Sequence, residues 1–191
     1  SDVVVVKGKT VVPEEKKVYL AFNKPRGIVC TAEKREKNNV IDYLSYPVRI
    51  YPVGRLDKDS EGLLLMTNDG AIVNGIMRAR NGHEKEYQVE VNREITPEFL
   101  KKMASGVPIL DTVTRPCKIR KTGEQSFTII LTQGLNRQIR RMCEALGYRV
   151  TKLKRVRVMN ISLKGLKTGE YRPLTEKELA ELKRQIGEEN R

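Results

Sequence analysis

The sequence is poor in the residues on which many enzymes and secreted proteins depend. Its 191 residues include no tryptophan, one histidine and three cysteines. Cys30, Cys117 and Cys143 are odd in number and widely spaced, so we predict reduced structural thiols rather than a disulfide framework or a CxxC metal site. His83 lies in a polar segment typical of the surface. Catalysis by a Ser-His-Asp or Cys-His set is therefore excluded, which leaves carboxylates, tyrosine, lysine and arginine.

Long apolar runs are also missing. No stretch approaches membrane-spanning length, and the N-terminus lacks a basic segment followed by an apolar one. We therefore expect no membrane span and no signal peptide, and we expect the protein to be cytoplasmic. With 39% hydrophobic and 32% charged residues, the chain has the composition of a soluble globular protein that is large enough to bury a core.

Positive charge is abundant and unevenly distributed. The formal net charge is +13. The segment from Arg115 to Arg172 contains 15 Lys or Arg and 3 Glu, which gives it a net charge of +12. A merely soluble surface would mix the two signs, whereas a basic half of this kind is expected of a protein that binds nucleic acid.

Hydrophobic periodicity predicts strands and helices that interleave without a regular βαβ rhythm. Helices are expected to follow Gly70, Pro97, Asn136 and Thr175, and strands are expected over residues 18–22, 63–67, 86–91, 127–132 and 152–161. The third helix should be capped by Asn136 and end at Gly147, and the last should end at Gly187. We predict an α+β fold with a central mixed, largely antiparallel sheet and flanking helices.

The segment from Tyr51 to Gly62 places a carboxylate, Asp57, on a loop between two strand-like runs. A charged turn needs no function, but a carboxylate in so basic a chain is expected to pair with a cation or to serve chemistry. Asp57, Asp59 and Glu61 also form a D-x-D-x-E series, so a metal-dependent nuclease stays open as an alternative.

Cations gather at the start of the third predicted helix. Arg137, Arg140 and Arg141 oppose the helix dipole, which costs up to about 1 kcal/mol each. We expect an anion nearby to offset that cost, either a phosphate or a buried carboxylate. Arg155 and Arg157 give the following strand a basic edge.

Four motifs in this order resemble the pseudouridine synthases of bacterial ribosomal RNA, in the branch of small-subunit synthase A and large-subunit synthases B, E and F. They are Asn-Lys-Pro-Arg-Gly27, Gly-Arg-Leu-Asp57, Lys-Glu-Tyr87 and Gly-Leu-Asn-Arg-Gln-Ile-Arg-Arg-Met142. The resemblance covers about residues 18–175. It implies two lobes around a basic cleft, with a catalytic domain at 18–187 and a frayed tail at 188–191. Residues 1–17 would be a strand pair and linker, either an edge hairpin or the tail of an upstream RNA-binding module.

The resemblance also implies residue roles. Asp57 would be the catalytic aspartate and Arg55 the arginine that assists base flipping. Tyr87 would stack on the target base, Ile139 would line its pocket, and Arg140 would pair with the aspartate. Lys24 and Pro25 match a supporting motif. The candidates for contact with RNA are Lys24, Arg26, Arg137, Arg141, Lys152, Arg155 and Arg157.

The implied reaction converts uridine to pseudouridine. It needs no cofactor and no metal, because it has no redox step and no outside group. Asp57 could act as a nucleophile or as a base. Ribosomal RNA is the expected partner, with the 23S molecule favoured and transfer RNA as a further candidate, and the protein is expected to be a monomer. The competing hypothesis is a non-catalytic RNA-binding module, for which the charge alone would suffice.

Overall fold

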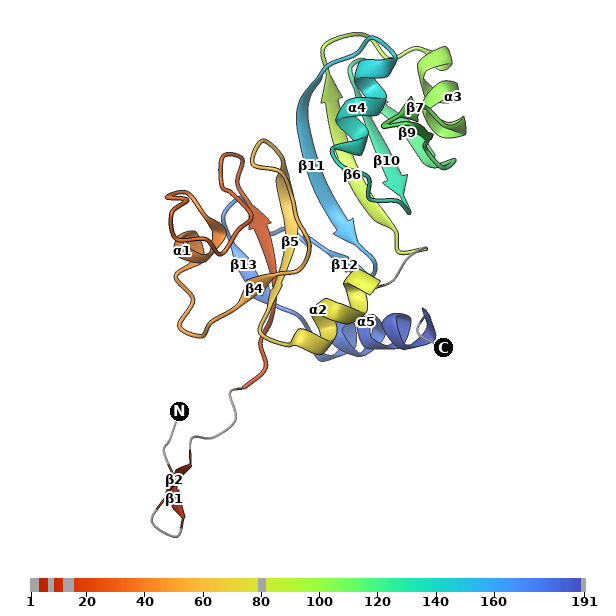
Figure 1. Cartoon of the computed structure of the whole chain (residues 1–191). Helices are drawn as coiled ribbons and strands as arrows, with labels where there is room; N and C mark the ends of the chain where they lie inside the picture. Colours follow the sequence, from red (N-terminus) through yellow and green to blue (C-terminus); the bar gives the residue numbers. More distant parts are fainter. Residues whose placement is uncertain (1–3, 7–8, 12–15, 79–81, 190–191) are drawn as a thin grey trace.

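The computed structural model describes residues 4–6, 9–11, 16–78 and 82–189. A nine-stranded sheet forms its centre and divides into two lobes (Figure 1). The first lobe contains β3 (Tyr19–Lys24), β4 (Tyr51–Pro52), β5 (Glu61–Thr67) and β13 (Tyr171–Pro173). The second contains β6 (Lys85–Val91), β9 (Lys118–Gly123), β10 (Ser126–Leu131), β11 (Val150–Val158) and β12 (Ile161–Ser162).

The first lobe buries both faces of its strands. Leu63 and Leu65 pack with the α2 (Gly70–Arg78) and α5 (Glu176–Glu189) side of the sheet, in one apolar cluster. Leu64 and Met66 point the other way, into a cluster that includes Val40 of α1 (Val40–Leu44). Because both faces are covered, β5 is a continuous apolar run rather than an alternating one.

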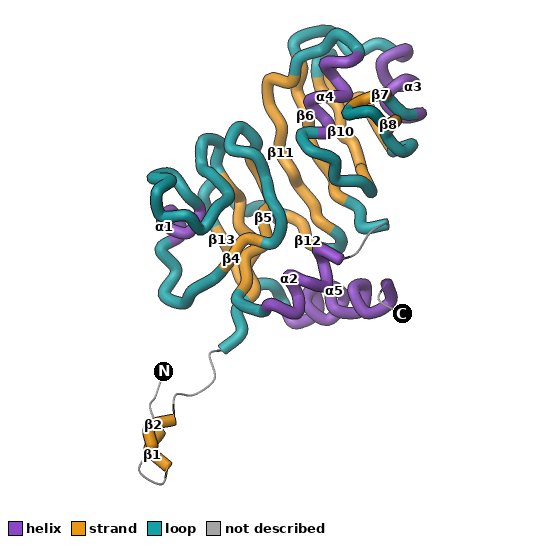
Figure 2. The backbone as a smooth tube through the Cα atoms, viewed as in Figure 1, coloured by secondary structure: helices purple, strands orange, loops and turns teal. Residues whose placement is uncertain are grey.

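The second lobe buries only one face of its strands. Along β6, Gln88 and Glu90 are exposed, whereas Val89 and Val91 are buried. The buried face packs against α3 (Pro97–Ser105) and α4 (Gln138–Ala145). Figure 2 shows these two helices together over the second lobe, with α2 and α5 gathered beneath the sheet and α1 at the far side of the first lobe. The short β7 (Pro108–Ile109) and β8 (Thr112–Val113) form a separate hairpin.

The lobes meet where β5 runs parallel to β11. This contact has only two residue pairs, Lys154 with Glu61 and Arg155 with Gly62, whereas the other strand pairs of the sheet are antiparallel. Gly62 has φ +110, and a Cβ there would lie 2.1 Å from the carbonyl oxygen of Arg155. The approach of the two strands therefore requires glycine at this position.

The predicted α+β fold with a mixed, largely antiparallel sheet and flanking helices is confirmed. The capping box of α5 is also confirmed, because Thr175 N–H donates to Glu178 at 2.8 Å and Glu178 N–H donates to Thr175 Oγ at 3.1 Å. The predicted stop at Gly187 is wrong: α5 continues to Glu189. Glycine lowers helix propensity by only about 1 kcal/mol, and the helix is held by packing of Leu182 and Ile186.

Near the N-terminus, β1 (Val4–Val6) and β2 (Lys9–Val11) pair with each other in an antiparallel ladder that is separate from the main sheet. Residues 7–8, between the two strands, lie outside the described residues. The assignment of 1–17 to the tail of an upstream module stays a prediction. Within the described residues, no helix is long and apolar enough to cross a membrane.

Candidate active site

The loop that carries Asp57 is held by its own turn and by a neighbouring one. Gly54 adopts φ +78 and redirects the chain after β4. Ser60 N–H donates to the Asp57 carbonyl at 3.0 Å, which closes the turn, and Gly27 N–H donates to the Lys58 carbonyl at 2.7 Å. The Asn-Lys-Pro-Arg-Gly27 turn therefore supports the Asp57 loop through this backbone hydrogen bond, in keeping with its assignment to a supporting motif.

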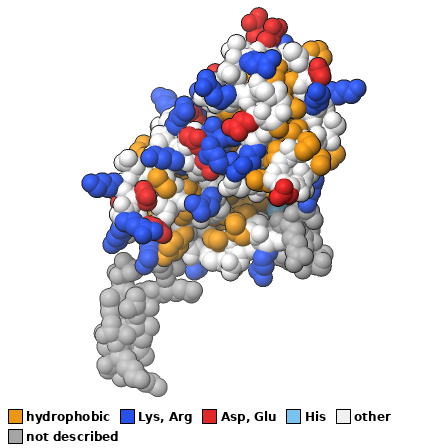
Figure 3. All heavy atoms as spheres, turned by 45° about the horizontal axis from the view of Figure 1, so that its top comes forward, with side chains coloured by type: hydrophobic (Ala, Val, Ile, Leu, Met, Phe, Trp, Pro, Cys, Tyr) orange, Lys and Arg blue, Asp and Glu red, His pale blue; other side chains and the backbone are white. Residues whose placement is uncertain are grey.

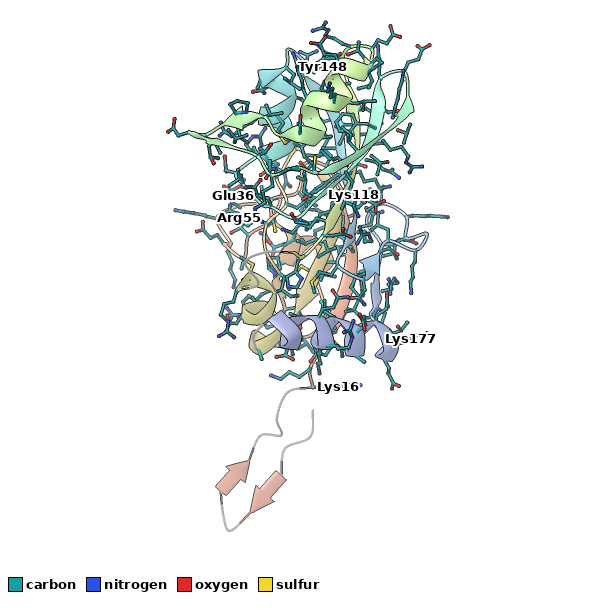
Figure 4. All side chains as sticks on the ribbon, turned by 90° about the vertical axis from the view of Figure 1, so that its right-hand side faces the viewer. Lys16, Glu36, Arg55, Lys118, Tyr148 and Lys177 are labelled. Carbon is teal, nitrogen blue, oxygen red and sulfur yellow. The ribbon has the colours of Figure 1, made fainter. Side chains whose placement is uncertain are left out.

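A cavity of about 760 Å³ opens beside this loop. Arg55 and Asp57 line it from the first lobe, and Tyr87 and Ile139 line it from the second. Such a volume lies within the range of small-molecule sites. Figure 4 shows Arg55 at the height where the lobes meet, below Tyr148 at the end of the second lobe. Four of the five residues to which the resemblance gives a catalytic or base-binding role thus line one cavity.

Arg137, not Arg140, forms the ion pair with Asp57. Its Nη1 lies 3.3 Å from Asp57 Oδ2 and 3.3 Å from Asp59 Oδ1, and its Nη2 lies 3.2 Å from Asp59 Oδ2. The hydrogen bond from Arg137 lowers the pKa of the Asp59 carboxyl, and the same bond raises the pKa of Arg137. Two aspartates of the loop therefore offset the charge of Arg137, although they are half-exposed rather than the buried carboxylate that was expected.

The predicted pairing of Arg140 with Asp57 is wrong. The Arg140 Nη2 donates to the Asp59 carbonyl and to Ser60 Oγ, both at 3.1 Å, and lies 3.7 Å from Asp59 Oδ1. Burial is the main cause that lowers the pKa of Arg140, and Asp59 opposes it. Arg140 lies about one helical turn further along α4 than Arg137. Its guanidinium therefore contacts the Asp59 carbonyl and the Ser60 hydroxyl rather than the Asp57 carboxylate.

The start of α4 explains this arrangement. The predicted cap by Asn136 is wrong, because Arg137 occupies the cap position with φ 49, in the left-handed region, and no side chain caps the helix. Asn136 instead accepts from Arg141, through its carbonyl at 3.0 Å and through Oδ1 at 2.9 Å. A non-glycine residue with positive φ is uncommon and is typical of functional sites. This conformation accompanies the contact of Arg137 with the aspartate loop.

Three predicted RNA contacts are structural residues. Lys24 is 0% exposed, and its Nζ donates to the carbonyls of Pro25 and Ile28 at 3.0 and 2.7 Å. Its burial lowers the pKa of the ammonium to about 8. Arg155 is 6% exposed and donates from Nε to the Leu63 carbonyl at 2.9 Å. Arg157 forms ion pairs of 3.1 Å with both Glu84 and Glu86.

The other candidates for contact with RNA do not all lie on the same side of the sheet. Arg26 is exposed at the lobe junction, with Nη1 3.5 Å from the Thr151 carbonyl. Lys152 pairs with Glu90 across β11 and β6, so it lies on the face opposite Val89 and the cavity. The basic half of the sequence therefore does not form one continuous surface. In Figure 3, Lys and Arg side chains gather across the middle of the molecule with carboxylates among them.

The D-x-D-x-E series does not form a metal site in the part of the chain that the structure describes. No group of three or more His, Cys, Asp or Glu residues in it could hold an ion. Asp57 and Asp59 face Arg137 instead. The cysteines are free, and burial raises the pKa of Cys117 to about 11 and of Cys143 to about 12. Cys30 and Cys143 are buried and Cys117 is half-buried, and their role as reduced structural thiols stays a prediction.

Two residues of this region were given no role from the sequence, although Lys85 belongs to the Lys-Glu-Tyr87 motif. Lys85 lines the cavity, and Ser60, which is 1% exposed, accepts the hydrogen bond from Arg140. The alternation of β6 could have identified Lys85, because it shares a strand face with Tyr87. No sequence signal distinguishes Ser60 from an ordinary turn serine.

Comparison with known proteins places the chain in a family. A family model described as RNA pseudouridylate synthase matches residues 18–145. The dual-specificity RNA pseudouridine synthase RluF of Salmonella typhi is 55% identical over 183 residues, which cover 95% of this chain and 63% of that protein. The chain thus spans less than two thirds of the length of this relative.

Two further matches agree. The ribosomal large subunit pseudouridine synthase B of Bacillus subtilis is 39% identical, over 96% of this chain and 78% of that protein. A crystal structure of a pseudouridylate synthase superposes with a TM-score of 0.81 at 29% identity, covering 91% of this chain and 76% of the other. The resemblance based on the four motifs is confirmed, and the chain belongs to the RNA pseudouridylate synthase family.

Proposed function

We propose that this chain isomerises uridine in RNA to pseudouridine, with Asp57 as the catalytic carboxylate. The observation that carries the proposal is the position of Asp57 in a nucleotide-sized cavity whose opposite wall contains Tyr87 and Ile139. Family membership supports the reaction class. In the alternative, a non-catalytic RNA-binding module, Asp57 would serve only to pair with Arg137.

The proposed roles follow from the positions of the side chains. A uridine in folded RNA must leave its stack, which costs a few kcal/mol, and stacking on Tyr87 returns about 1–3 kcal/mol. The Asp57 carboxylate then acts at the sugar, either on the anomeric carbon or on the proton of the neighbouring carbon. Arg137 holds that carboxylate in place through the 3.3 Å contact. The exposed Arg55 is free to follow the extruded nucleotide.

The proposed substrate is ribosomal RNA, with the large-subunit molecule favoured. A relative is named as a large-subunit synthase, and others are named as dual-specificity enzymes. Transfer RNA is the candidate for a second substrate. The proposed RNA contacts there are three exposed cations: Arg55 and Arg137, which line the cavity, and Arg26, which lies at the lobe junction. The proposed setting is the cytoplasm, with the protein as a monomer.

The test is release of tritium from RNA labelled at carbon 5 of uridine, with chelator present. The wild type should release tritium, and Asp57→Asn should bind the RNA and release none. Asp111→Asn is the matched control, because Asp111 is exposed in the β7–β8 turn and is not among the residues that line the cavity. Wild-type RNA binding without release would contradict the proposal and favour the binding module. Metal-dependent cleavage of the RNA chain without release of tritium would favour the nuclease class, because a nuclease breaks phosphodiester bonds and leaves the C5–H bond of uracil intact.

A further inference from the structure

Lys85 carries a positive charge into the cavity. Within the described residues, its ammonium makes no hydrogen bond or ion pair, although the side chain is half-buried. Its strand neighbours are Leu131 on β10 and Val158 on β11, which are both apolar and both line the cavity. The Nζ lies 3.3 Å from the position that a Cβ on Gly134 would occupy, so the amine lies against the loop before α4.

A half-buried cation that has no partner among the described residues is unfavourable in the free protein. Burial is the first cause that lowers the pKa of Lys85, and the neighbouring charge of Arg155 adds to it. Arg155 is itself held by the carbonyl of Leu63. A lysine in such a position is expected to meet a negative charge when a ligand fills the cavity.

The position of Lys85 relative to Tyr87 indicates which part of the substrate it meets. The two residues lie two positions apart on the same face of β6, about 7 Å along the strand. A base that stacks on Tyr87 therefore extends its edge toward Lys85. Leu153 and Ile139 line the same cavity and favour an aromatic ring over a hydrated group.

A phosphate fits this position less well than a base does. Phosphates remain hydrated, and the exposed Arg55 and Arg137 offer them cations at the cavity's open side. Lys85 lies instead between the apolar Leu131 and Val158. The local chemistry thus favours a carbonyl oxygen of the uracil ring as its partner.

We propose that Lys85 is a further catalytic residue, whose ammonium binds a carbonyl oxygen of the extruded uracil and stabilises the negative charge that the ring gains during the reaction. The inference rests on the proposed function. When the C1′–N1 bond breaks, its electron pair remains with the base and spreads from N1 onto the carbonyl oxygens. The ring then turns, C5 forms the bond to C1′, C5 loses its proton, and N1 gains one. Lys85 acts on the anionic base between these two bond changes.

Negative charge builds up on the uracil carbonyl oxygen when the C1′–N1 bond breaks. The Lys85 ammonium therefore binds this oxygen more strongly during the reaction than before it. Removing a donor to a developing oxyanion typically lowers the rate by about 100-fold or more. We therefore expect Lys85→Met to lower the single-turnover rate of tritium release at saturating enzyme by about 100-fold. The dissociation constant for the RNA, measured by filter binding, should stay within about threefold, because few phosphate contacts are lost. Lys85→Arg keeps the charge and should recover part of the rate.

Lys118→Met is the matched control. Lys118 lies on β9 opposite Ile130, on the face of the second lobe that is turned away from the cavity, and its side chain is 78% exposed. Figure 4 shows Lys118 and Arg55 at similar height on different sides of the molecule. This variant should keep both the rate and the affinity.

Three outcomes are informative. An unchanged rate in Lys85→Met would overturn the inference while leaving the proposed function intact. Weaker RNA binding with a normal rate at saturation would also overturn it, and would assign Lys85 to a phosphate. If the wild type itself releases no tritium, the proposed function fails first. The melting temperature of Lys85→Met shows whether this variant folds. If it folds poorly, Lys85→Ala is assayed with and without added methylammonium. Recovery of the rate with methylammonium would show that the reaction needs the cation that the variant lacks.

Discussion

The two lobes of this molecule are built from the same kind of sheet but are covered differently. The first lobe has apolar clusters on both faces of β5, whereas the second lobe leaves one face of β6 open to water. The first therefore shows an unbroken apolar run at residues 63–66, and the second shows alternation. The difference bears on where the site forms: Tyr87 and Ile139 of the second lobe line the cavity from the covered side of that sheet, not from the face open to water.

The candidate active site occupies the junction between the lobes. The first lobe contributes the aspartate loop, and the second contributes the aromatic and apolar wall together with the arginines that reach across. Arg137 contacts Asp57 and Asp59, and Arg140 contacts Ser60. The site therefore exists only when the lobes are docked. Variants at the junction should affect both stability and activity, whereas variants remote from it should affect stability alone.

The largest effect is expected at the strand contact itself. Gly62→Val should destabilise the fold by about 3–5 kcal/mol, since it adds strain at φ +110 and forces side-chain atoms onto the Arg155 carbonyl. Tritium release should be lost as well. Urea unfolding with Gly70→Ala as control measures this, because a Cβ on Gly70 meets nothing within 4 Å. A valine variant as stable as the wild type would show that β5 and β11 do not touch in solution.

A smaller effect is expected at the arginine that links the lobes. Arg140→Ala leaves the buried Ser60 hydroxyl and the Asp59 carbonyl without their donor, which should cost about 2–3 kcal/mol. Activity should fall together with stability, because the aspartate loop loses its support. Arg141→Ala removes a similar side chain that bonds only within the second lobe, to Asn136, and should cost less than about 1 kcal/mol. Equal losses in the two variants would argue against the bridging role.

The smallest effect is expected away from the junction. Glu178 pairs with Arg172 at 2.8 Å and with Lys164 at 3.3 Å, and its side chain is 7% exposed. The hydrogen bond from Arg172 lowers the pKa of Glu178 to about 2. Because the unfolded pKa is higher, near 4.5, this carboxylate contributes stability above pH 4.5, and the contribution is lost as the pH falls toward 2.

Glu178→Gln should therefore cost about 2 kcal/mol at pH 7, and the difference from the wild type should vanish near pH 2. Urea unfolding of both proteins across this pH range measures it. Activity at pH 7 should stay close to that of the wild type, since Glu178 lies on α5 and neither it nor Arg172 lines the cavity. A large loss of activity without a loss of stability would contradict the expectation that variants remote from the junction affect stability alone.

Much of the fold could be predicted because it depends on local patterns. The alternation of β6, the Thr-Pro start of α3 and the capping box of α5 each specify an element within a few residues. The short α1 and the edge strands β9 and β13 were not predicted. Their residues carry little apolar periodicity: β9, for example, is exposed or half-exposed along its whole length. Such elements are fixed by pairing with neighbours that are distant in the sequence.

The sequence by itself determined the fold class, the aspartate loop and the cavity residues Asp57, Tyr87 and Ile139. Only the tertiary structure decided which arginine meets which carboxylate, and which cations are buried. Asp57 and Arg137 are 80 residues apart, and Arg137 and Arg140 differ by one helical turn. A shift of about one turn, roughly 5 Å, moves a guanidinium from the carboxylates of Asp57 and Asp59 to the Asp59 carbonyl and the Ser60 hydroxyl. Sequence periodicity fixes the face of a helix, but the packing of two lobes fixes how deep along that face a charge lies.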